Sequence, residues 1–297
     1  MTDDEFREAM RPLTDAMSEY AKAAAGLGEA NGLVPAVGSR GMDELAAESQ
    51  WSQPGWEQPT TNAFSYGLVV LHHVAEHVAA FAAVIDGSSV GPTYAHYAHV
   101  RAVMDGVTVA HWLGDLRIAF ETRVKRSFVY RYNSANQIGG FTNYLPTAGA
   151  ESERIRKACV DFAAANKWEF TGNGLDGEVL PRDGVGFCEI AFGAKNEALE
   201  RVMWMLASAT QHVKWMALAQ ALHQGRQEAL VDPLDPSLRA VPMVVDGEAL
   251  GQMGCTIWHG FRAVIDERCE LMGWPKPPAL KEAEAAMREY CRGAARF

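Results

Sequence analysis

The residues best suited to chemistry in this chain of 297 residues stand at helical spacings in apolar segments. Arg101 and Asp105 are four residues apart, which places them on one face of a helix and predicts an ion pair. A charged pair is costly to bury unless its members satisfy each other or a partner. The pair therefore either fixes the register of the helix or holds Arg101 ready for a carboxylate or phosphate ligand.

Ser208 and His212 repeat this spacing in a second apolar segment, and Trp215 follows them. A serine and a histidine on one helix do not form a hydrolase triad, because the nucleophile needs a strained turn and the chain lacks a GxSxG motif. A histidine satisfied within the core is one interpretation. The other is acid–base chemistry, in which His212 faces Arg101 and Asp105 from a neighbouring helix and Ser208 and Trp215 contact the ligand.

A basic segment follows the Arg101–Asp105 pair. Residues 101–140 hold six Lys/Arg against three Asp/Glu, a local balance of +3, whereas the formal net charge of the chain is -10. The overall charge disfavours broad nucleic-acid binding, which depends on cationic side chains. If the segment binds an anion, Arg123 and Arg126 are the expected ligand-binding residues. The alternative is a solvated helix face with ion pairs such as Glu121 with Lys125.

His73 and His77 are also four residues apart, with Glu76 between them. This spacing lets one helix face share a metal ion, and the three residues match the HxxEH pattern of one class of zinc peptidases. The spacing supplies no third ligand, so hydrogen-bonded histidines are the favoured interpretation. We therefore expect neither a metal ion nor another cofactor.

The elements that must position these residues are helices. Apolar residues recur at intervals of three and four, and glycine or proline marks the segment ends. We predict an all-α, multi-helix bundle of seven to nine helices with long Gly/Pro-rich loops. The predicted helices span 3–25, 42–48, 61–86, 92–114, 117–138, 150–166, 195–224, 247–272 and 279–294, and the core is assigned to 61–86, 92–114, 117–138 and 195–224.

The chain divides into an extension and a bundle. Residues 1–60 are interpreted as an N-terminal helix, which Pro12 breaks or kinks, followed by a loop that Trp51 and Trp56 pin to the core. Residues 61–297 form the bundle domain. Residues 168–194 contain six glycines and predict a loop with a short hairpin over an opening in the bundle.

Cysteine usage and the N-terminal sequence bear on the compartment. The five cysteines are dispersed without CxxC spacing, which predicts reduced, mostly buried thiols. The N-terminal segment is acidic and polar, unlike a secretory signal, and no run of about 18 apolar residues predicts a membrane span. We therefore expect a cytoplasmic protein without a membrane partner.

One set of residues resembles a known group of proteins. It extends over roughly residues 65–225 and comprises Arg101, Asp105, Trp112, Leu113, Arg123, Arg126, Ser208, His212 and Trp215. The pattern resembles helical proteins common in high-GC Gram-positive bacteria, whose bundle is similar to that of HEPN proteins. Many HEPN proteins are RNA-cleaving toxins, defence proteins or RNA-processing factors. This chain lacks their catalytic Arg-x4-6-His signature and has Asp105 where glutamate is usual, so the resemblance implies the fold and the place of the site more than ribonuclease activity.

Three functions agree with the sequence, and we rank the first slightly ahead of the other two. The first is a HEPN-like protein linked to nucleic acid, with RNA or a small anionic ligand as its partner. The second is a small-molecule-binding protein or enzyme with an aromatic- and Met-lined pocket between helices. The third is a purely structural protein. The large side chains of Met203, Trp204, Trp215 and Met216 exceed what one central helix needs, so we also expect a homodimer.

Overall fold

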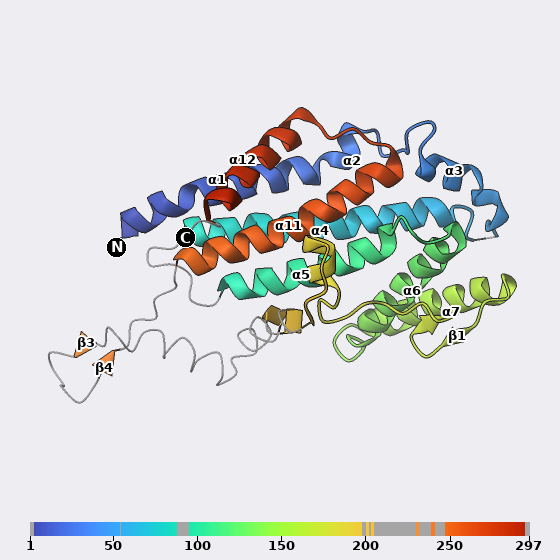
Figure 1. Cartoon of the computed structure of the whole chain (residues 1–297). Coiled ribbons are helices and arrows are strands. Elements are labelled where there is room, and N and C mark those ends of the chain that lie inside the picture. The colour runs from blue at the N-terminus through green and yellow to red at the C-terminus, as the bar shows by residue number, and fades with distance from the viewer. Residues whose placement is uncertain are drawn as a thin grey trace.

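The computed structural model describes residues 3–53, 55–87, 95–197, 200–201, 203–204, 230–231, 239–240 and 247–294. Within these residues the chain forms ten α-helices and almost no strand (Figure 1). The predicted all-α fold class is therefore confirmed. Most of the predicted helix 195–224, with Ser208, His212, Trp215 and Met216, lies outside the described residues.

The helix bounds follow the sequence signals closely. The elements are α1 (Asp3–Ala25), α2 (Leu27–Ala30), α3 (Arg40–Ala46), the 3₁₀ helix η1 (Glu48–Gln50), α4 (Pro59–Asp86), α5 (Ala95–Gly114), α6 (Phe120–Gly139), α7 (Pro146–Ala165), α8 (Phe187–Phe192), α11 (Gly247–Met272) and α12 (Pro278–Ala294). Prolines begin α4, α7 and α12, where a missing N–H costs no helical hydrogen bond. Pro12 was expected either to break or to kink this helix; α1 continues through it, so the proline does not begin a new segment.

Two short hairpins complete the described elements. The strand β1 (Phe170–Thr171) pairs with β2 (Gly174–Leu175), and β3 (Leu230–Val231) pairs with β4 (Arg239–Ala240), both antiparallel. The first hairpin confirms the one expected within residues 168–194. The same segment also contains α8, which is six residues long and therefore too short to show helical periodicity.

The main hydrophobic core lies between α1, α4, α5, α11 and α12, which run alongside one another (Figure 1). Leu13, Met17 and Tyr20 of α1 are fully buried in it. The helix of the predicted N-terminal extension thus belongs to the same core as the bundle.

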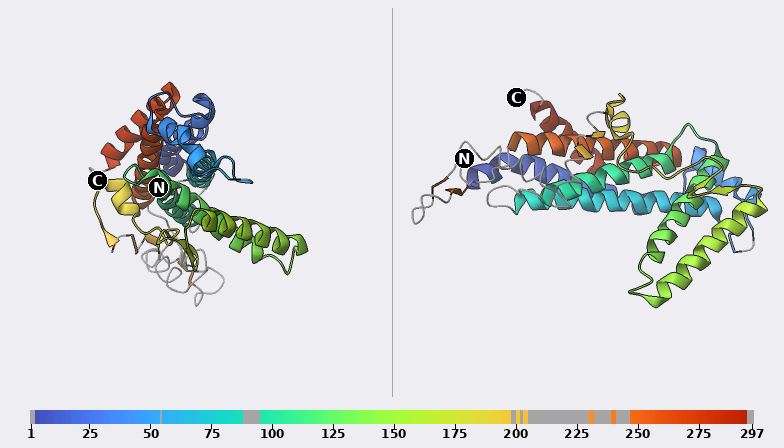
Figure 2. Two further views of the ribbon diagram at one scale, coloured as in Figure 1. Left: turned by 90° about the vertical axis from the view of Figure 1, so that its right-hand side faces the viewer. Right: turned by 90° about the horizontal axis from the view of Figure 1, so that it is seen from below.

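A second hydrophobic cluster joins α6, α7 and the first hairpin, and these two helices project from the side of the main bundle (Figure 2). The rings of Trp51 and Trp168 lie 5.1 Å apart, and those of Trp56 and Phe128 lie 4.6 Å apart. Both tryptophans therefore pin their loop to this cluster, as predicted.

Among the described residues, α4 is the one helix long and apolar enough to cross a membrane, with a mean hydropathy of 1.8 in its most apolar window. Val74, Val78, Phe81 and Ile85 of this helix are fully buried in the main core. The core helix of a globular protein has the same length and composition, so this observation is weak evidence for a membrane span.

The prediction of uniformly reduced cysteines is wrong for one pair. Cys255 on α11 and Cys291 on α12 form a disulfide with their Cα atoms 5.8 Å apart. The two helices are neighbours connected by a short loop, and the sequence spacing of 36 residues does not reveal this proximity. Cys159, Cys188 and Cys269 are free and buried, as expected.

Candidate functional site

Polar side chains recur along one face of α5, and two cavities open beside it. Positions 101, 105, 108 and 111 fall within one broad face of this helix, and position 115 directly follows its last residue. The first cavity, of about 490 Å³, is lined by Arg101 and Asp105. The second, of about 450 Å³, is lined by His111 and Asp115 near the C-terminal end of the helix.

The first cavity contains part of the predicted site. The Nε atom of Arg101 lies 3.6 Å from Oδ2 of Asp105, which confirms this pair. Trp204 completes the arrangement, because its Nε1 donates to Oδ1 of Asp105 over 3.3 Å and the Arg101 guanidinium lies 4.7 Å from the centre of its ring. The structure thus joins Arg101 and Asp105 to Trp204, while His212 lies outside the described residues and the three-residue site stays a prediction.

The Arg101–Asp105 pair is less buried than the apolar pattern implies, since the Asp105 side chain is 39% exposed. Burial still raises the pKa of the Asp105 carboxyl, and the nearby Arg101 charge and the Trp204 hydrogen bond only partly oppose this rise. The Arg101–Asp105 pair at this cavity is therefore only partly shielded from solvent.

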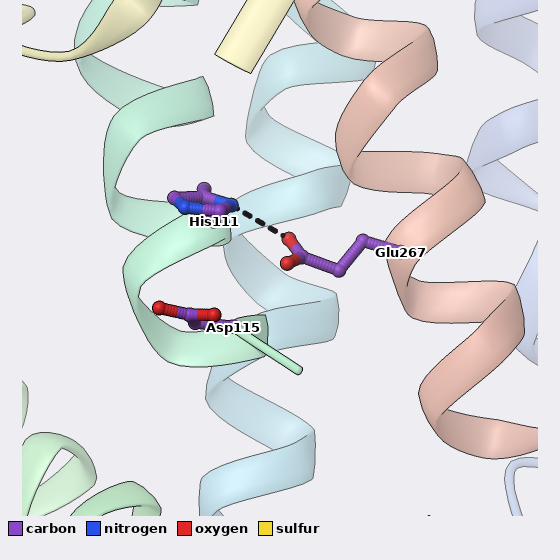
Figure 3. Close-up of side chains that lie close together, drawn as sticks. All are labelled: His111, Asp115 and Glu267. Atoms are coloured by element: carbon purple, nitrogen blue, oxygen red, sulfur yellow. Dashed lines mark hydrogen bonds and ion pairs between the residues drawn. The ribbon is translucent and has the colours of Figure 1, made fainter. Parts of the chain in front are cut away.

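The second cavity brings together residues from three helices. The Nδ1 atom of His111 lies 3.0 Å from Oε2 of Glu267 on α11 (Figure 3). The opposite wall comes from Val185 and Gly186 and from Glu189 and Ile190 of α8. The glycine-rich segment expected to cover an opening in the bundle thus supplies part of this cavity.

Asp115 lies four residues after His111 and directly follows the last residue of α5, Gly114 (Figure 3). Its Oδ1 accepts the backbone N–H of Arg117 over 2.9 Å, and the Arg117 guanidinium binds both carboxylate oxygens. Burial raises the pKa of the Asp115 carboxyl, but these hydrogen bonds outweigh burial and leave the pKa below its usual value. The Arg117 guanidinium also lies 3.4 Å from Nε2 of His111.

His111, Asp115 and Glu267 can each offer one ligand atom within 4.8 Å of the others. Among the described residues, this is the only group of three or more possible metal ligands. All three side chains are largely shielded from solvent: the exposed fraction is 26% for His111, 10% for Asp115 and 13% for Glu267. In the tautomer with the proton on Nδ1, His111 donates to Glu267 and its Nε2 faces the Arg117 guanidinium, so a carboxylate orients the ring as in many general bases. One nitrogen and two carboxylates are also a ligand set for a divalent metal ion.

The connection between α5 and α6 holds Asp115 and Arg117 in place. Arg123, which is 1% exposed, donates to both carboxylate oxygens of Glu44 on α3 and to the backbone carbonyls of Leu113 and Asp115. Arg40 donates to the carbonyls of Leu116 and Ile118 and pairs with the same Glu44. These contacts use every nitrogen of the Arg123 guanidinium and indicate a positioning role rather than the ligand-binding role predicted for it.

Arg126 lines the second cavity, but it is already engaged. It donates to the carbonyl of Trp112 and to Glu178 over 2.6 Å each, and its guanidinium lies 5.2 Å from the centre of the Trp112 ring. The other cations of the basic segment are also paired. Lys125 contacts Glu121 and Asp176 over 2.8 Å each, which confirms the predicted Glu121–Lys125 pair, and Arg131 donates to Tyr66.

The histidines of α4 meet a third histidine that sequence spacing could not supply. The rings of His73 and His77 lie 4.4 Å apart, and Nδ1 of His77 lies 3.0 Å from Nδ1 of His99 on α5. Burial lowers the pKa of both His77 and His99. Among the described residues these histidines belong to no group of three metal ligands.

Sequence reasoning missed the second cavity because its decisive contact is long-range. His111 and Asp115 are four residues apart, but the predicted helix ends at residue 114, so the sequence did not place them on one helix face. Glu267 stands 156 residues after His111 and shows no local signal. Comparisons of the chain with protein-family models, with curated proteins and with solved structures found no match.

Proposed function

We propose that this protein is a small-molecule enzyme whose active site is the cavity between α5, α8 and α11. The observation that carries the proposal is the convergence of His111, Asp115 and Glu267 on one cavity of about 450 Å³. This volume falls in the usual range of sites for metabolite-sized ligands. The wall combines converging polar and charged groups with the apolar side chains of Trp112, Val185 and Ile190. The substrate is accordingly a small polar molecule.

The pairing of the basic segment favours this proposal over a nucleic-acid-linked, HEPN-like role. Binding to a phosphate backbone draws on cations that can exchange counterions for phosphates. Arg123, Lys125 and Arg126 are instead paired with carboxylates of the chain itself. RNA binding and the homodimer stay predictions, to be measured by a salt series and by light scattering.

A panel of nucleotides, sugar phosphates, carboxylic acids and amines, screened by ligand-observed NMR, tests the proposal. At least one class is expected to bind the wild-type chain and to lose binding in Ala263→Leu, which fills the second cavity. Ala102→Leu fills the first cavity and is the matched control.

Two outcomes would overturn the proposal. One is ligand binding that Ala263→Leu leaves intact. The other is a chain that binds none of the panel but binds RNA with an affinity that falls steeply as salt rises.

A further inference from the structure

We infer that the second cavity holds a divalent transition-metal ion, with His111, Asp115 and Glu267 as its protein ligands. The inference rests on the proposed function, since it names the cofactor of that same cavity. Three protein ligands and an open side toward a cavity are the arrangement of catalytic zinc sites, in which a water or the substrate takes the remaining position. One imidazole with two carboxylates suits Zn²⁺ or Mn²⁺.

The spacing of the donor atoms fits a shared ion. Zinc bonds to histidine nitrogen and to carboxylate oxygen are both about 2.0–2.2 Å long, so two ligands of one tetrahedral ion lie about 3.4 Å apart, a few tenths of an ångström more than the observed separation. The Nδ1 atom of His111 and Oε2 of Glu267 lie 3.0 Å apart. Both side chains come from helices packed in the main core, so little rearrangement is needed to place an ion against them (Figure 3).

Asp115 is oriented as a third ligand by its own neighbours. Its Oδ1 is fixed by the backbone N–H of Arg117 over 2.9 Å. Hydrogen bonds of this kind from outside the ligand set commonly orient metal-binding carboxylates. Its Oδ2 accepts the Arg117 guanidinium over 3.2 Å, and that side chain is 73% exposed. An ion bound here displaces the guanidinium from Asp115 and His111, and the exposed side chain then turns into solvent.

The charges around the cavity also favour a cation. Its lining contains the carboxylates of Asp115, Glu189 and Glu267 and the guanidinium groups of Arg117 and Arg126. Arg126 is paired with Glu178, a fourth carboxylate at 2.6 Å. The balance is negative, and Arg117 supplies the positive charge that a bound ion replaces.

Such an ion would lower the pKa of a bound water toward neutrality and so supply a nucleophile for hydrolysis. The roles of this chain's residues then follow from their positions. His111, Asp115 and Glu267 fix the ion, and Trp112 and Ile190 contribute apolar wall around it.

Isothermal titration of Zn²⁺ into the full-length, chelator-treated chain tests this site, with Co²⁺ absorption as a second readout of ligand geometry. We expect one ion per chain. Glu267→Gln and Asp115→Asn keep their shape and hydrogen-bonding oxygen, so they preserve the fold but remove ligand charge. Each is expected to weaken Zn²⁺ binding by at least ~100-fold, because even partners outside the ligand set are worth about 10–100-fold.

Arg117→Gln distinguishes a metal site from a network of ion pairs. Removing a positive charge next to the ion is expected to tighten Zn²⁺ binding about tenfold. His72→Gln is the matched control, because His72 pairs with Glu76 on the protein surface, where both side chains are exposed. His99→Gln is a second control, because His77 and His99 could hold an ion of their own. Neither control is expected to change the affinity.

The inference is overturned if Zn²⁺ does not bind, if Glu267→Gln binds it as the wild type does, or if only His99→Gln abolishes binding. The proposed function has a separate readout in the ligand screen with Ala263→Leu. A chain that binds a small molecule in this cavity without Zn²⁺ keeps the proposed function and loses the metal. A chain that binds Zn²⁺ but no small molecule keeps the metal site and loses the proposed function.

Discussion

His111 on α5 and Glu267 on α11 face each other over 3.0 Å, although 156 residues separate them in the sequence. Each belongs to a helix that packs in the main core, so their proximity follows from how α5 and α11 pack together. These two donors are therefore positioned by the packing of the bundle, which favours function that needs fixed donor positions.

The close approach of α4 and α11 depends on Gly67. A Cβ atom added at this position would overlap the guanidinium of Arg268, which is 2% exposed. Gly67→Ala is therefore expected to lower the free energy of unfolding by about 1–3 kcal/mol, the usual cost of overpacking a core. Urea denaturation measures the change.

The matched control is Gly293→Ala, because an added Cβ there meets nothing within 4 Å. This substitution in α12 should be neutral or stabilising, since alanine favours helix more than glycine does. Equal effects at both positions would contradict the packing argument.

The buried ion pair between Glu44 and Arg123 should be essential for folding. Arg123 is 1% exposed, and among the described residues Glu44 is the only carboxylate bonded to its guanidinium. Glu44→Gln removes that negative charge. Breaking such a pair from one side typically costs about 3–5 kcal/mol. We expect a loss of that order in chemical denaturation.

Glu151→Gln breaks the solvent-exposed pair with Arg154 and serves as the control. It should leave the denaturation midpoint unchanged, because exposed pairs contribute little. A Glu44→Gln variant as stable as this control would show that Arg123 does not need its partner.

The histidine pair between α4 and α5 predicts a pH dependence of stability. Burial lowers the pKa of His77 and His99 in the folded chain, and the neighbouring His73 lowers that of His77 further while Glu76 opposes it. Because the unfolded chain binds protons more readily, stability is fully present above the ordinary histidine pKa of about 6.5 and falls as the pH drops through the lowered values.

Thermal denaturation from pH 8 to pH 5 measures this dependence. His99→Gln should flatten the profile, and His72→Gln, at an exposed position, should not. Identical slopes in all three proteins would assign the pH dependence to other groups.

The disulfide between Cys255 and Cys291 should stabilise the attachment of α12. A crosslink that closes a loop of 36 residues is expected to add roughly 4 kcal/mol through restriction of the unfolded chain. Cys291→Ser and reduction of the wild type should lower the denaturation midpoint equally. A reductant that still destabilises Cys291→Ser would point to another crosslink.

The fold was largely predictable because helix ends are encoded locally. Glycine after α4 and α11 marked C-terminal bounds that match those observed, whereas α4 and α7 begin at Pro59 and Pro146, before the predicted starts at 61 and 150. The short helix α8 was missed because six residues do not display a helical period. Gly186 and Gly193 flank this helix and adopt left-handed conformations that glycine favours. In the sequence, glycines at both ends of so short a segment are typical of a loop.

The candidate site was predictable only within single helices. The pairs Arg101–Asp105 and His73–His77 were visible because helical spacing sets them, and both meet as expected. The partners from elsewhere in the chain, Glu267 and Glu44, depend on which helix faces match across the core. A sequence pattern of one helix contains no information on that match.

The two hydrophobic clusters divide the chain into two units that can open independently, since cooperative unfolding follows contiguous packing. Trp112 packs against both clusters, and the wall of the second cavity combines this residue and Arg126 of α6 with Glu267 of α11. A molecule bound there bridges the two units, so its binding free energy opposes their separation. By thermodynamic linkage, occupancy should slow amide hydrogen exchange throughout the projecting pair α6–α7, far beyond the residues that the ligand touches.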